Sequence, residues 1–365
     1  METIKKIQRF PSTSNRSLKA WSAADEHLLK NLESEILPAS SITILNDRFG
    51  YLSVHLAKNN PTIITHFKSQ EDAIKTNFEQ NEIDAVKNNF SHLTDDRNIK
   101  SDFVLIKIPK SMNLFHFFVM KAHALSKSNT KVFCGFMTRH FTKQMITIAS
   151  QYFDNVDQGL AWKKSRVLTL SSPKTLTLDT SPITSIPFVN HRGENLEFSQ
   201  YFGVFSGNHI DYATQFLIEN ITVDTFATKA LDLASGNGVI ACEIRAKSKN
   251  IEIHLMDDSQ LAIESSKLNL KEGNNIFHYD YSLDHFEDQF FDLIVSNPPF
   301  HFEHENTIEI ALQLFKEVSR ILKSDGEFLL VANLHLNYKT HLVHLFEKVE
   351  VINMNSKFEV LKCKN

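Results

Sequence analysis

The sequence predicts an α/β protein made of two domains in tandem, each built on a largely parallel sheet with helices on both faces. Strands alternate with helices throughout residues 188–365, which is the pattern of a doubly wound, Rossmann-like sheet. Shifting the first half by 188 to 189 residues places its segments over those of the second half, which indicates an internal duplication. Residues 171–187 are rich in Ser, Thr and Pro and predict a linker between residues 1–170 and 188–365.

The hydrophobic pattern of the second half assigns its elements in order. Residues 229–248 contain an apolar strand, a turn of small residues and a helix, and residues 251–270 repeat this pattern. Residues 290–300 supply a strand that ends in the motif Asn-Pro-Pro-Phe. The remaining predicted elements are a helix at roughly 307–323, a turn at 324–327, a strand at 328–333, another helix, and two closing strands near 349–355 and 357–364.

Composition limits the classes of protein to which this chain can belong. With 365 residues, of which 42% are hydrophobic, the chain can bury the cores of two domains. It contains no run of 18 apolar residues and no signal-peptide pattern, so we expect a cytoplasmic protein without membrane segments. Its three cysteines are far apart and lack C-x-x-C spacing, so we expect neither disulfides nor a metal site.

Positive charge is concentrated in the first half. Residues 1–170 carry a net charge of +7 and residues 171–365 carry −11, which together give the total of −4. A basic domain joined to an acidic one suggests that the first half holds a polyanion, although chance surface composition is the alternative. Lys163, Lys164 and Arg166 are candidate RNA contacts, and a solvated basic face is an equally good interpretation of these three residues.

Residue types that bind ligands stand at the predicted carboxyl ends of three strands, where doubly wound sheets bind their ligands. Gly236 and Gly238 lie between a strand and a helix, and glycines there let a ligand approach the backbone, unless they serve only tight packing. Asp257 and Asp258 end the next strand, as a ribose-binding carboxylate would, and Asp280 ends the third. The loop has neither G-x-G-x-x-G nor G-K-[ST], so S-adenosylmethionine fits better than NAD or ATP.

The motif at the end of residues 290–300 predicts chemistry on an exocyclic amine. The prolines that follow Asn297 fix the backbone and remove competing donors. The Asn297 side-chain oxygen and the Pro298 carbonyl can then accept both amine hydrogens and direct the nitrogen lone pair at a methyl donor, without a general base. Phe300 would stack on the base. A proline-rich turn capped by an aromatic residue is the structural alternative.

These motifs resemble a known family of enzymes. The pattern D-x-x-x-G-x-G, the acidic residue after the second strand and "NPPF" are similar to class I S-adenosylmethionine-dependent methyltransferases that act on amino groups. More specifically, "VSNPPFH", "VANLHL" and "FKEVSRILKSDGE", with "IQRFPST" and "LAWKKSR" in the first half, resemble the RlmG/RsmC family of rRNA (guanine-N2)-methyltransferases over nearly the whole chain. The resemblance implies methylation of a guanine 2-amino group in 23S rRNA or in a large-subunit assembly intermediate.

The same resemblance implies the residues of the site. It places Asp232, Ala234, Gly236 and Gly238 around the cofactor, and it makes Asn297 both a catalytic residue and a cofactor contact. The family's loop usually reads D-x-G-C-G-x-G, so alanine and serine at positions 234 and 235 replace a glycine and a cysteine. The added methyl group at position 234 predicts weaker cofactor binding.

A segment upstream of the glycine loop also matches the family. Phe205 and Asp211 fit its F-S-R-x-G-[LI]-D pattern and are candidate substrate contacts, while Gly207 stands in the place of the arginine. An ordinary helix start, capped near Asn208, is the alternative interpretation of this segment.

The first half keeps the predicted fold but has lost the residues that bind ligands. At the offset of 188 to 189 residues, residues 46–49 fill the glycine turn, Ser69 and Gln70 replace the acidic residues, and Ile108 stands in the place of Asn297. We therefore expect a degenerate methyltransferase-like domain that holds RNA through its phosphates. The alternatives for the whole chain are the same reaction on 16S rRNA and a non-catalytic RNA-binding or chaperone module.

Overall fold

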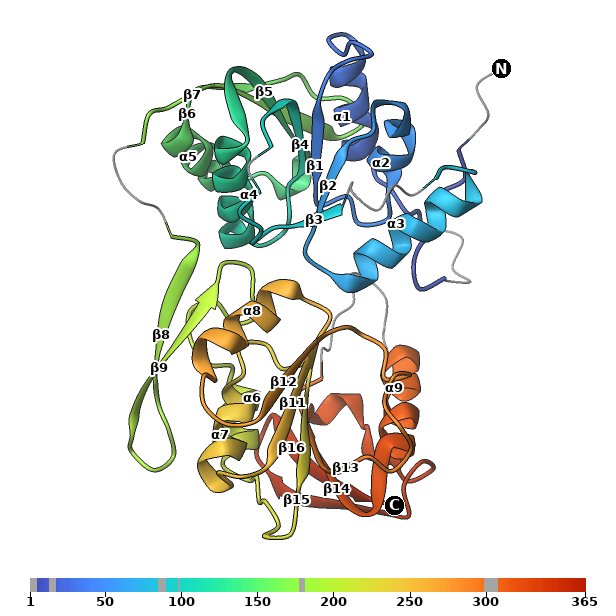
Figure 1. The fold of residues 1–365 in the computed structure, drawn as a ribbon, viewed down its shortest axis with the longest axis vertical. Coiled ribbons are helices and arrows are strands. Elements are labelled where there is room, and N and C mark those ends of the chain that lie inside the picture. Colours follow the sequence, from blue (N-terminus) through green and yellow to red (C-terminus); the bar gives the residue numbers. More distant parts are fainter. Residues whose placement is uncertain (1–4, 13–17, 85–89, 98, 177–180, 299–307) are drawn as a thin grey trace. The chain divides into compact units, whose positions relative to one another are not determined.

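The computed structural model describes residues 5–12, 18–84, 90–97, 99–176, 181–298 and 308–365. The chain forms two compact units, Met1–Pro182 and Ile183–Asn365. Figure 1 shows the ribbon of each unit, with a central sheet and helices on both sides of it. The predicted linker is shorter than residues 171–187, because the preceding strand continues to Pro173 and the next strand begins at Ile183.

The first unit contains one seven-stranded sheet of order β3-β2-β1-β4-β5-β7-β6. Its strands are β1 (Ile42–Leu45), β2 (Thr62–Thr65), β3 (Phe90–His92), β4 (Ser101–Lys107), β5 (Ser126–Met137), β6 (Phe153–Gln158) and β7 (Ser165–Pro173). Its helices include α1 (Ala23–Glu33), α2 (Tyr51–His55), α3 (Lys68–Gln80), α4 (Met112–Ala124) and α5 (Lys143–Tyr152). Only β7 runs antiparallel to its neighbours β5 and β6.

The second unit repeats this topology in the order β12-β11-β10-β13-β14-β16-β15. Its strands are β10 (Lys229–Leu233), β11 (Glu252–Asp257), β12 (Asn275–Tyr279), β13 (Phe291–Ser296), β14 (Leu322–Asn333), β15 (Lys348–Met354) and β16 (Phe358–Lys364). Its helices include α6 (Tyr212–Ile218), α7 (Val239–Lys247), α8 (Gln260–Asn269), α9 (Ile308–Ile321) and α10 (Lys339–Leu342). A separate hairpin, β8 (Ile183–Val189) and β9 (Asn195–Tyr201), precedes them.

The two identical strand orders confirm the predicted pair of Rossmann-like domains. The predicted turn at 324–327 is instead part of the long strand β14. The register between β13 and β14 jumps there, because Phe291 pairs with Leu322 whereas Leu293 pairs with Glu327. A bulge therefore absorbs the turn residues without ending the strand.

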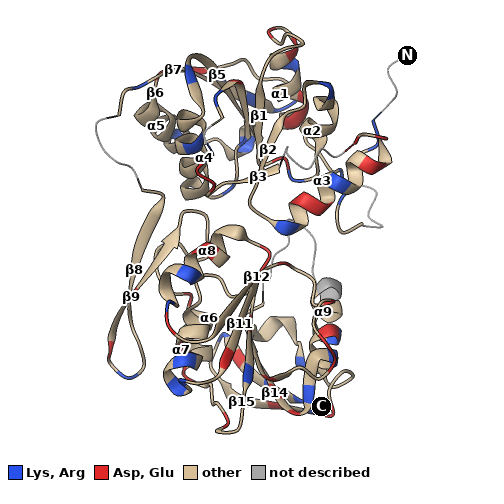
Figure 2. Cartoon of the chain, viewed as in Figure 1, with Lys and Arg blue, Asp and Glu red and all other residues tan. Residues whose placement is uncertain are grey.

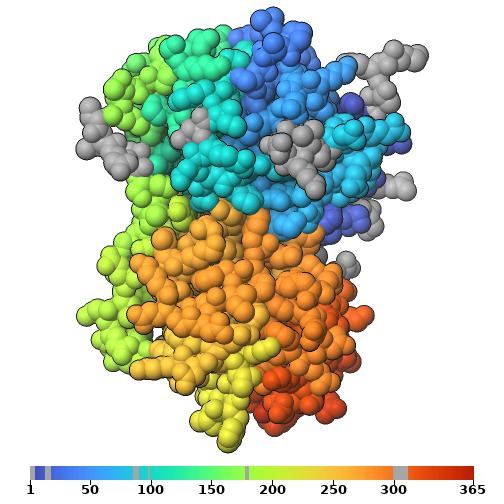
Figure 3. Space-filling model, in the orientation of Figure 1, coloured from blue at the N-terminus to red at the C-terminus, as the bar shows by residue number. Residues whose placement is uncertain are grey.

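Each face of the second sheet has its own apolar core, because successive strand residues point to opposite faces. Val295 packs with α6 and α7 on one face, and Ile294 packs with α9 on the other. Figure 1 shows the helices on these two sides of the sheet. Figure 3 shows the surface of the second unit, which runs from yellow-green through orange to red along the chain. Ligands can therefore reach the sheet only at its edges and ends.

Strand pairing corrects the predicted correspondence between the halves. In the first unit Thr43 of β1 pairs with Thr62 of β2, and in the second unit Leu231 of β10 pairs with His254 of β11. The offset between the two units is therefore 188 residues for the first strand of each pair and 192 for the second. The second unit has four more residues between these strands, and a constant offset therefore fails. The positions of Asp257 and Asp258 belong to Thr65 and His66 and not, as expected, to Ser69 and Gln70.

The same correction applies to the strand that carries the Asn-Pro-Pro-Phe motif. Thr43 pairs with Val104, and Leu231 pairs with Ile294, so the offset at this strand is 190. The residue of the first unit that corresponds to Asn297 is therefore Lys107. Ile108, which the sequence alignment placed there, lies one position further along the chain.

Candidate active site

The turn after β10 is the centre of the candidate site. Ala234, Gly236 and Gly238 all have left-handed backbone conformations, with φ of 62°, 55° and 81°. A Cβ added to Gly236 would meet no atom within 4 Å, so open space lies beside the backbone there. A Cβ added to Gly238 would approach Ser266 Oγ to 3.0 Å, so this glycine lets α7 pack closely on α8. The turn therefore provides a concave stretch of backbone beside open space.

Asp232 connects the strand before this turn to the helix after it. It is fully buried near the end of β10, and its Oδ2 accepts a hydrogen bond from the Ala241 amide at 3.0 Å. Its other oxygen, Oδ1, has no hydrogen-bond partner among the described residues. Burial, together with the nearby Asp257, raises the pKa of Asp232 well above its ordinary value. This carboxyl group fixes the start of α7 and has no exposed surface.

The acidic residues predicted to hold the cofactor lie at neighbouring strand ends. Asp257 accepts hydrogen bonds from the amides of Gly236 (3.0 Å, to Oδ2) and Ser259 (2.8 Å, to Oδ1). Desolvation raises its pKa to about 6, and the adjacent, half-buried Asp258 contributes to the rise. The Asp280 amide donates to the Asp257 carbonyl at 3.2 Å. The fold thus brings the turn, Asp257 and Asp280 together, as predicted from their positions after successive strands.

Asn297 follows β13, the strand that pairs with β10. Its Nδ2 donates to Asp211 Oδ2 at 3.1 Å and to Thr214 Oγ1 at 2.8 Å. Its Oδ1 is buried and has no hydrogen-bond partner among the described residues. Pro298 is buried beside it, while Phe300 lies outside the described residues. The amide therefore presents an unused acceptor at the carboxyl end of the sheet, where an amine could donate to it.

The segment before α6 is a capped helix start whose cap differs from the predicted one. The helix begins at Tyr212 and its N-cap is Asp211, not a residue near Asn208, because the Asp211 carboxylate accepts from the amides of Ala213 and Thr214. Phe205 is 70% exposed. Sequence reasoning missed Thr214, whose hydroxyl binds the Asn297 amide. The only signal was the pattern Asp-x-x-Thr at a helix start, which indicates a cap and not a contact with a residue 83 positions away.

In the first unit, side chains occupy the corresponding turn. Asn46 and Gly50 repeat the conformations of Ala234 and Gly238, with φ of 63° and 81°. Arg48 stands in the place of Gly236, donates to Ser69 Oγ at 3.0 Å and lies over the rings at 49 and 67. Asn46 Nδ2 donates to the Lys107 carbonyl at 2.8 Å. The first unit therefore repeats the left-handed backbone conformations of the glycine turn and places an arginine where the second unit has Gly236.

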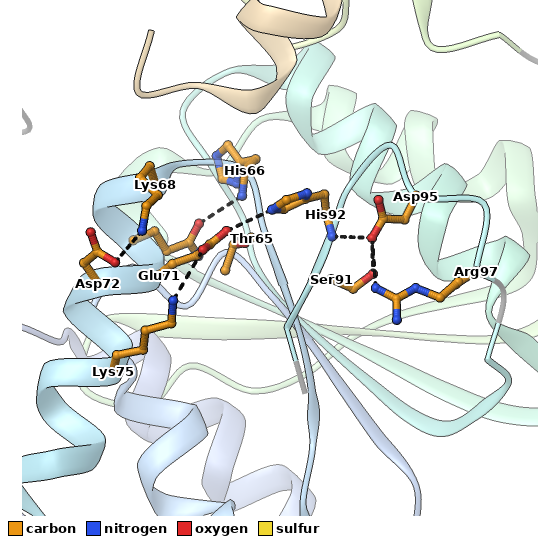
Figure 4. A network of polar contacts seen from close by, with 11 residues as sticks. Thr65, His66, Lys68, Glu71, Asp72, Lys75, Ser91, His92, Asp95 and Arg97 are labelled. Atoms are coloured by element: carbon orange, nitrogen blue, oxygen red, sulfur yellow. Dashed lines mark hydrogen bonds and ion pairs between the residues drawn. The ribbon is translucent and has the colours of Figure 1, made fainter. Parts of the chain in front are cut away.

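A polar network lies at the ends of β2 and β3 in the same unit (Figure 4). Glu71 accepts from Thr65 Oγ1 at 3.1 Å and lies 2.9 Å from His92 Nε2. Asp95 accepts from Ser91 Oγ and from the His92 amide, both at 2.9 Å. Residues of the network line a cavity of about 410 Å³. Because these carboxylates are satisfied by donors of the network itself, the arrangement indicates a structural role.

Of the candidate RNA contacts, Lys163 and Lys164 lie in the turn between β6 and β7, and Arg166 lies at the start of β7. Lys163 Nζ is 2.8 Å from Glu26 Oε2 and 4.5 Å from the centre of the Trp162 ring. Lys164 is exposed and Arg166 is half-buried. Figure 2 shows Lys and Arg interspersed with Asp and Glu along α3 of the same unit. Some basic side chains of the first half are thus held in local ion pairs, and the net charge of +7 is what remains after all its acidic residues are counted.

Comparison with known proteins assigns the class of this fold and site. The family model of the RLMG N-terminal domain matches residues 2–174, and that of the methyltransferase small domain matches residues 195–362. A solved structure of the T. thermophilus 16S rRNA methyltransferase RsmC, in complex with AdoMet and guanosine, superimposes with a TM-score of 0.78. It covers 99% of this chain and 97% of its own, at 16% identity, and shows the same fold. The second unit is a methyltransferase domain of class I.

Curated relatives narrow the class to one family. The ribosomal RNA large subunit methyltransferase G of Shewanella oneidensis is 31% identical over 97% of this chain and 96% of its own length. The enzyme of the same name from Vibrio parahaemolyticus is 29% identical over 98% and 94%. The chain belongs to the ribosomal RNA large subunit methyltransferase G family. Among the described residues, no helix is long and apolar enough to cross a membrane.

Proposed function

We propose that the second unit transfers the methyl group of S-adenosylmethionine to the exocyclic 2-amino group of a specific guanine in 23S rRNA. The observation that carries this proposal is the buried Asn297 Oδ1, an acceptor without a partner among the described residues. It lies just beyond β13, beside the strand that leads into the glycine turn. An unpaired buried acceptor is costly, and an amine that donates to it would remove the cost.

The reaction follows from the properties of the two acceptors. A guanine amine is a weak nucleophile because its lone pair is delocalised into the ring. Hydrogen bonds from its two hydrogens to Asn297 Oδ1 and the Pro298 carbonyl favour a pyramidal nitrogen with the lone pair free to attack. Neither acceptor is basic, so the proton released after methylation passes to water. Fixed dipoles and alignment lower the barrier, and no side chain needs to act as a base.

The residues around the glycine turn suit the cofactor. S-adenosylmethionine, when bound, supplies an electrophilic methyl group. The open space beside Gly236 admits a ligand to the backbone. Asp257 uses one acceptor site of each oxygen on backbone amides, which leaves further lone pairs for ribose hydroxyls. Asp258 and Asp280 flank it at the same edge, and Ala234 is the residue that adds a methyl group where the family has glycine.

The substrate is proposed from the relatives and from the first unit. The relatives' name refers to large-subunit ribosomal RNA, which favours 23S over 16S rRNA. The first unit would hold the RNA through phosphates, with its own ligand turn filled by Arg48. Naked 23S rRNA or a large-subunit assembly intermediate in the cytoplasm would be the partner.

The experiment that tests the function is methyl transfer to purified RNA. The protein is incubated with labelled S-adenosylmethionine and with 23S or 16S rRNA from cells that lack the gene. Modified nucleosides are then identified by mass spectrometry. We expect one N2-methylguanine per 23S molecule and none in 16S rRNA. Label only in 16S rRNA, or in a base other than guanine, would overturn the proposal.

Cofactor affinity is expected to depend on pH through Asp257. Its pKa of about 6 means that the carboxylate is ionised above that pH and increasingly protonated below it. Only the ionised form accepts from hydroxyls at both oxygens, so affinity should be constant above about pH 7 and fall by up to about tenfold per pH unit below 6. Calorimetric titrations between pH 5 and 8 check this. Asp257→Asn should bind weakly at every pH, and an unchanged pH profile in that variant would assign the titration elsewhere.

RNA affinity is expected to depend on the basic residues Lys164 and Arg166 of the first unit. Charge reversal at Lys164 and Arg166 should weaken 23S rRNA binding and reduce the salt slope of log affinity by about one to two, because up to two phosphate contacts are lost. Lys163 is left intact because its partner Glu26 would be unpaired by the change. Lys249→Glu, on the exposed surface of the second unit, is the matched control. Filter binding at several salt concentrations measures both, and equal losses in variant and control would reject this RNA contact.

A further inference from the structure

We propose that Asp211 and Thr214 are positioning residues that hold the Asn297 amide with its oxygen toward the reacting amine. This inference rests on the proposed role of Asn297. Two of these residues lie at the start of one helix, where Asp211 caps α6 and Thr214 lies in its first turn, and Asn297 follows the distant strand β13. Without a constraint, a side-chain amide can turn over and exchange its oxygen with its nitrogen.

The contacts define which way the amide faces. Asn297 Nδ2 lies 3.1 Å from Asp211 Oδ2 and 2.8 Å from Thr214 Oγ1. An ionised carboxylate only accepts hydrogen bonds, so the amide atom beside Asp211 must be the nitrogen. Turning the amide over would place oxygen against oxygen and lose this hydrogen bond. Both donors of the amide are used by the helix, and the acceptor is left for the substrate.

The cap and the contact share one atom. Asp211 Oδ2 also accepts from the amides of Ala213 at 3.0 Å and Thr214 at 3.2 Å. These bonds to the first turn of α6 fix the carboxylate, and α6 is itself held by the packing of Ala213 and Leu217 in the core. The amide is thus tied to a rigid element, which is the condition for a preorganised dipole.

The first unit supports this assignment independently. Thr214 is three residues after the cap Asp211, and Asp25 is three residues after the cap Ser22 at the start of α1. Asp25 Oδ2 accepts from Lys107 Nζ at 2.6 Å, and Lys107 corresponds to Asn297. In each unit a side chain in the first turn of the first helix therefore contacts the residue at the end of the corresponding strand, β4 in the first unit and β13 in the second. In the first unit the residue at the strand end is Lys107, whose ammonium group only donates, whereas Asn297 of the second unit also carries an acceptor.

The test is the variant Asp211→Asn in the full chain. The new side chain keeps the size and an oxygen for the helix cap, but it can offer an amide donor to Asn297, which allows the catalytic amide to turn over. We expect kcat to fall by about tenfold to a hundredfold, with KM for RNA and the affinity for S-adenosylmethionine nearly unchanged. Thr214→Val, which removes the hydroxyl, should also lower kcat. Thr214→Ser, which keeps the hydroxyl, should have a kcat close to that of the unmodified protein.

Combination with Asn297→Ala separates positioning from a general effect on folding. If Asp211 acts through the amide, Asp211→Asn should add little to the loss already caused by Asn297→Ala in single-turnover assays. Multiplied losses, or normal turnover in Asp211→Asn, would overturn the inference. The proposed function has its own criterion, because it fails if Asn297→Ala alone retains turnover. Thermal unfolding of each variant identifies losses caused by misfolding, and in that case the comparison of Thr214→Val with Thr214→Ser decides.

Discussion

Replacing Asn297 with alanine is expected to lower kcat by about a hundredfold or more. The change removes Asn297 Oδ1, a buried acceptor without a partner among the described residues, which we propose binds the amine and directs its lone pair. The affinity for S-adenosylmethionine should change little, because the turn after β10 and Asp257 remain intact. Single-turnover methylation of 23S rRNA measures the first quantity, and calorimetry measures the second.

The opposite pattern would contradict the mechanism. Near-normal turnover in Asn297→Ala would show that the amine is activated by another group. A large loss of cofactor affinity with turnover preserved at saturating cofactor would instead give Asn297 only the cofactor-binding role that the sequence resemblance also implied.

Replacing Gly236 with valine is expected to abolish detectable binding of S-adenosylmethionine. The glycine has φ of 55°, and an added Cβ would project into space that no described atom within 4 Å occupies. A β-branched side chain there would fill the proposed cofactor space and would also strain the backbone by about 1–2 kcal/mol.

A matched control separates these two effects. Gly193 lies in the turn between β8 and β9, has φ of 77° and also has no atom within 4 Å of an added Cβ. Gly193→Val should cause similar backbone strain and a similar loss of thermal stability, but cofactor binding should be retained. Unimpaired binding in Gly236→Val would show that the ligand lies elsewhere.

The sequence predicted the parts of the fold that depend on local pattern. The order of strands and helices, the glycine turn and the acidic strand ends all follow from periodicity and residue type within short segments. The boundary of the turn at 324–327 was wrong because pairing with β13 overrides the local preference of Gly326 and its neighbours. The cap near Asn208 was wrong for a similar reason, since several polar residues there are competent caps and only the tertiary structure selects Asp211.

Other features were beyond the reach of sequence reasoning because they depend on contacts between distant segments. The second unit has four more residues than the first between its first two strands, which a sequence alignment at constant offset cannot show. Thr65, and not Ser69, therefore corresponds to Asp257. The bond from Thr214 to Asn297 joins residues that no periodic pattern connects. Asn297 could be proposed from the sequence because the prolines that follow it are a local signal.

The polar atoms left without partners around the glycine turn have a consequence for folding. Asp232 Oδ1, Ser235 Oγ and Asn297 Oδ1 are buried without a hydrogen bond among the described residues. At the corresponding positions the first unit has an apolar Ile44, an Asp47 that binds Ser53 at 2.7 Å, and a Lys107 paired with Asp25.

Each unsatisfied buried group costs about 1–3 kcal/mol, so these three atoms lower the conformational stability of the second unit. A ligand that donates to Asn297 Oδ1 would return part of that stability, because anything that binds only the native state shifts the unfolding equilibrium. The polar side chains at the corresponding positions of the first unit are bonded within the protein, whereas Asn297 Oδ1 of the second unit would gain its hydrogen bond only from a bound ligand. Ligand binding and folding stability are therefore coupled in the second unit.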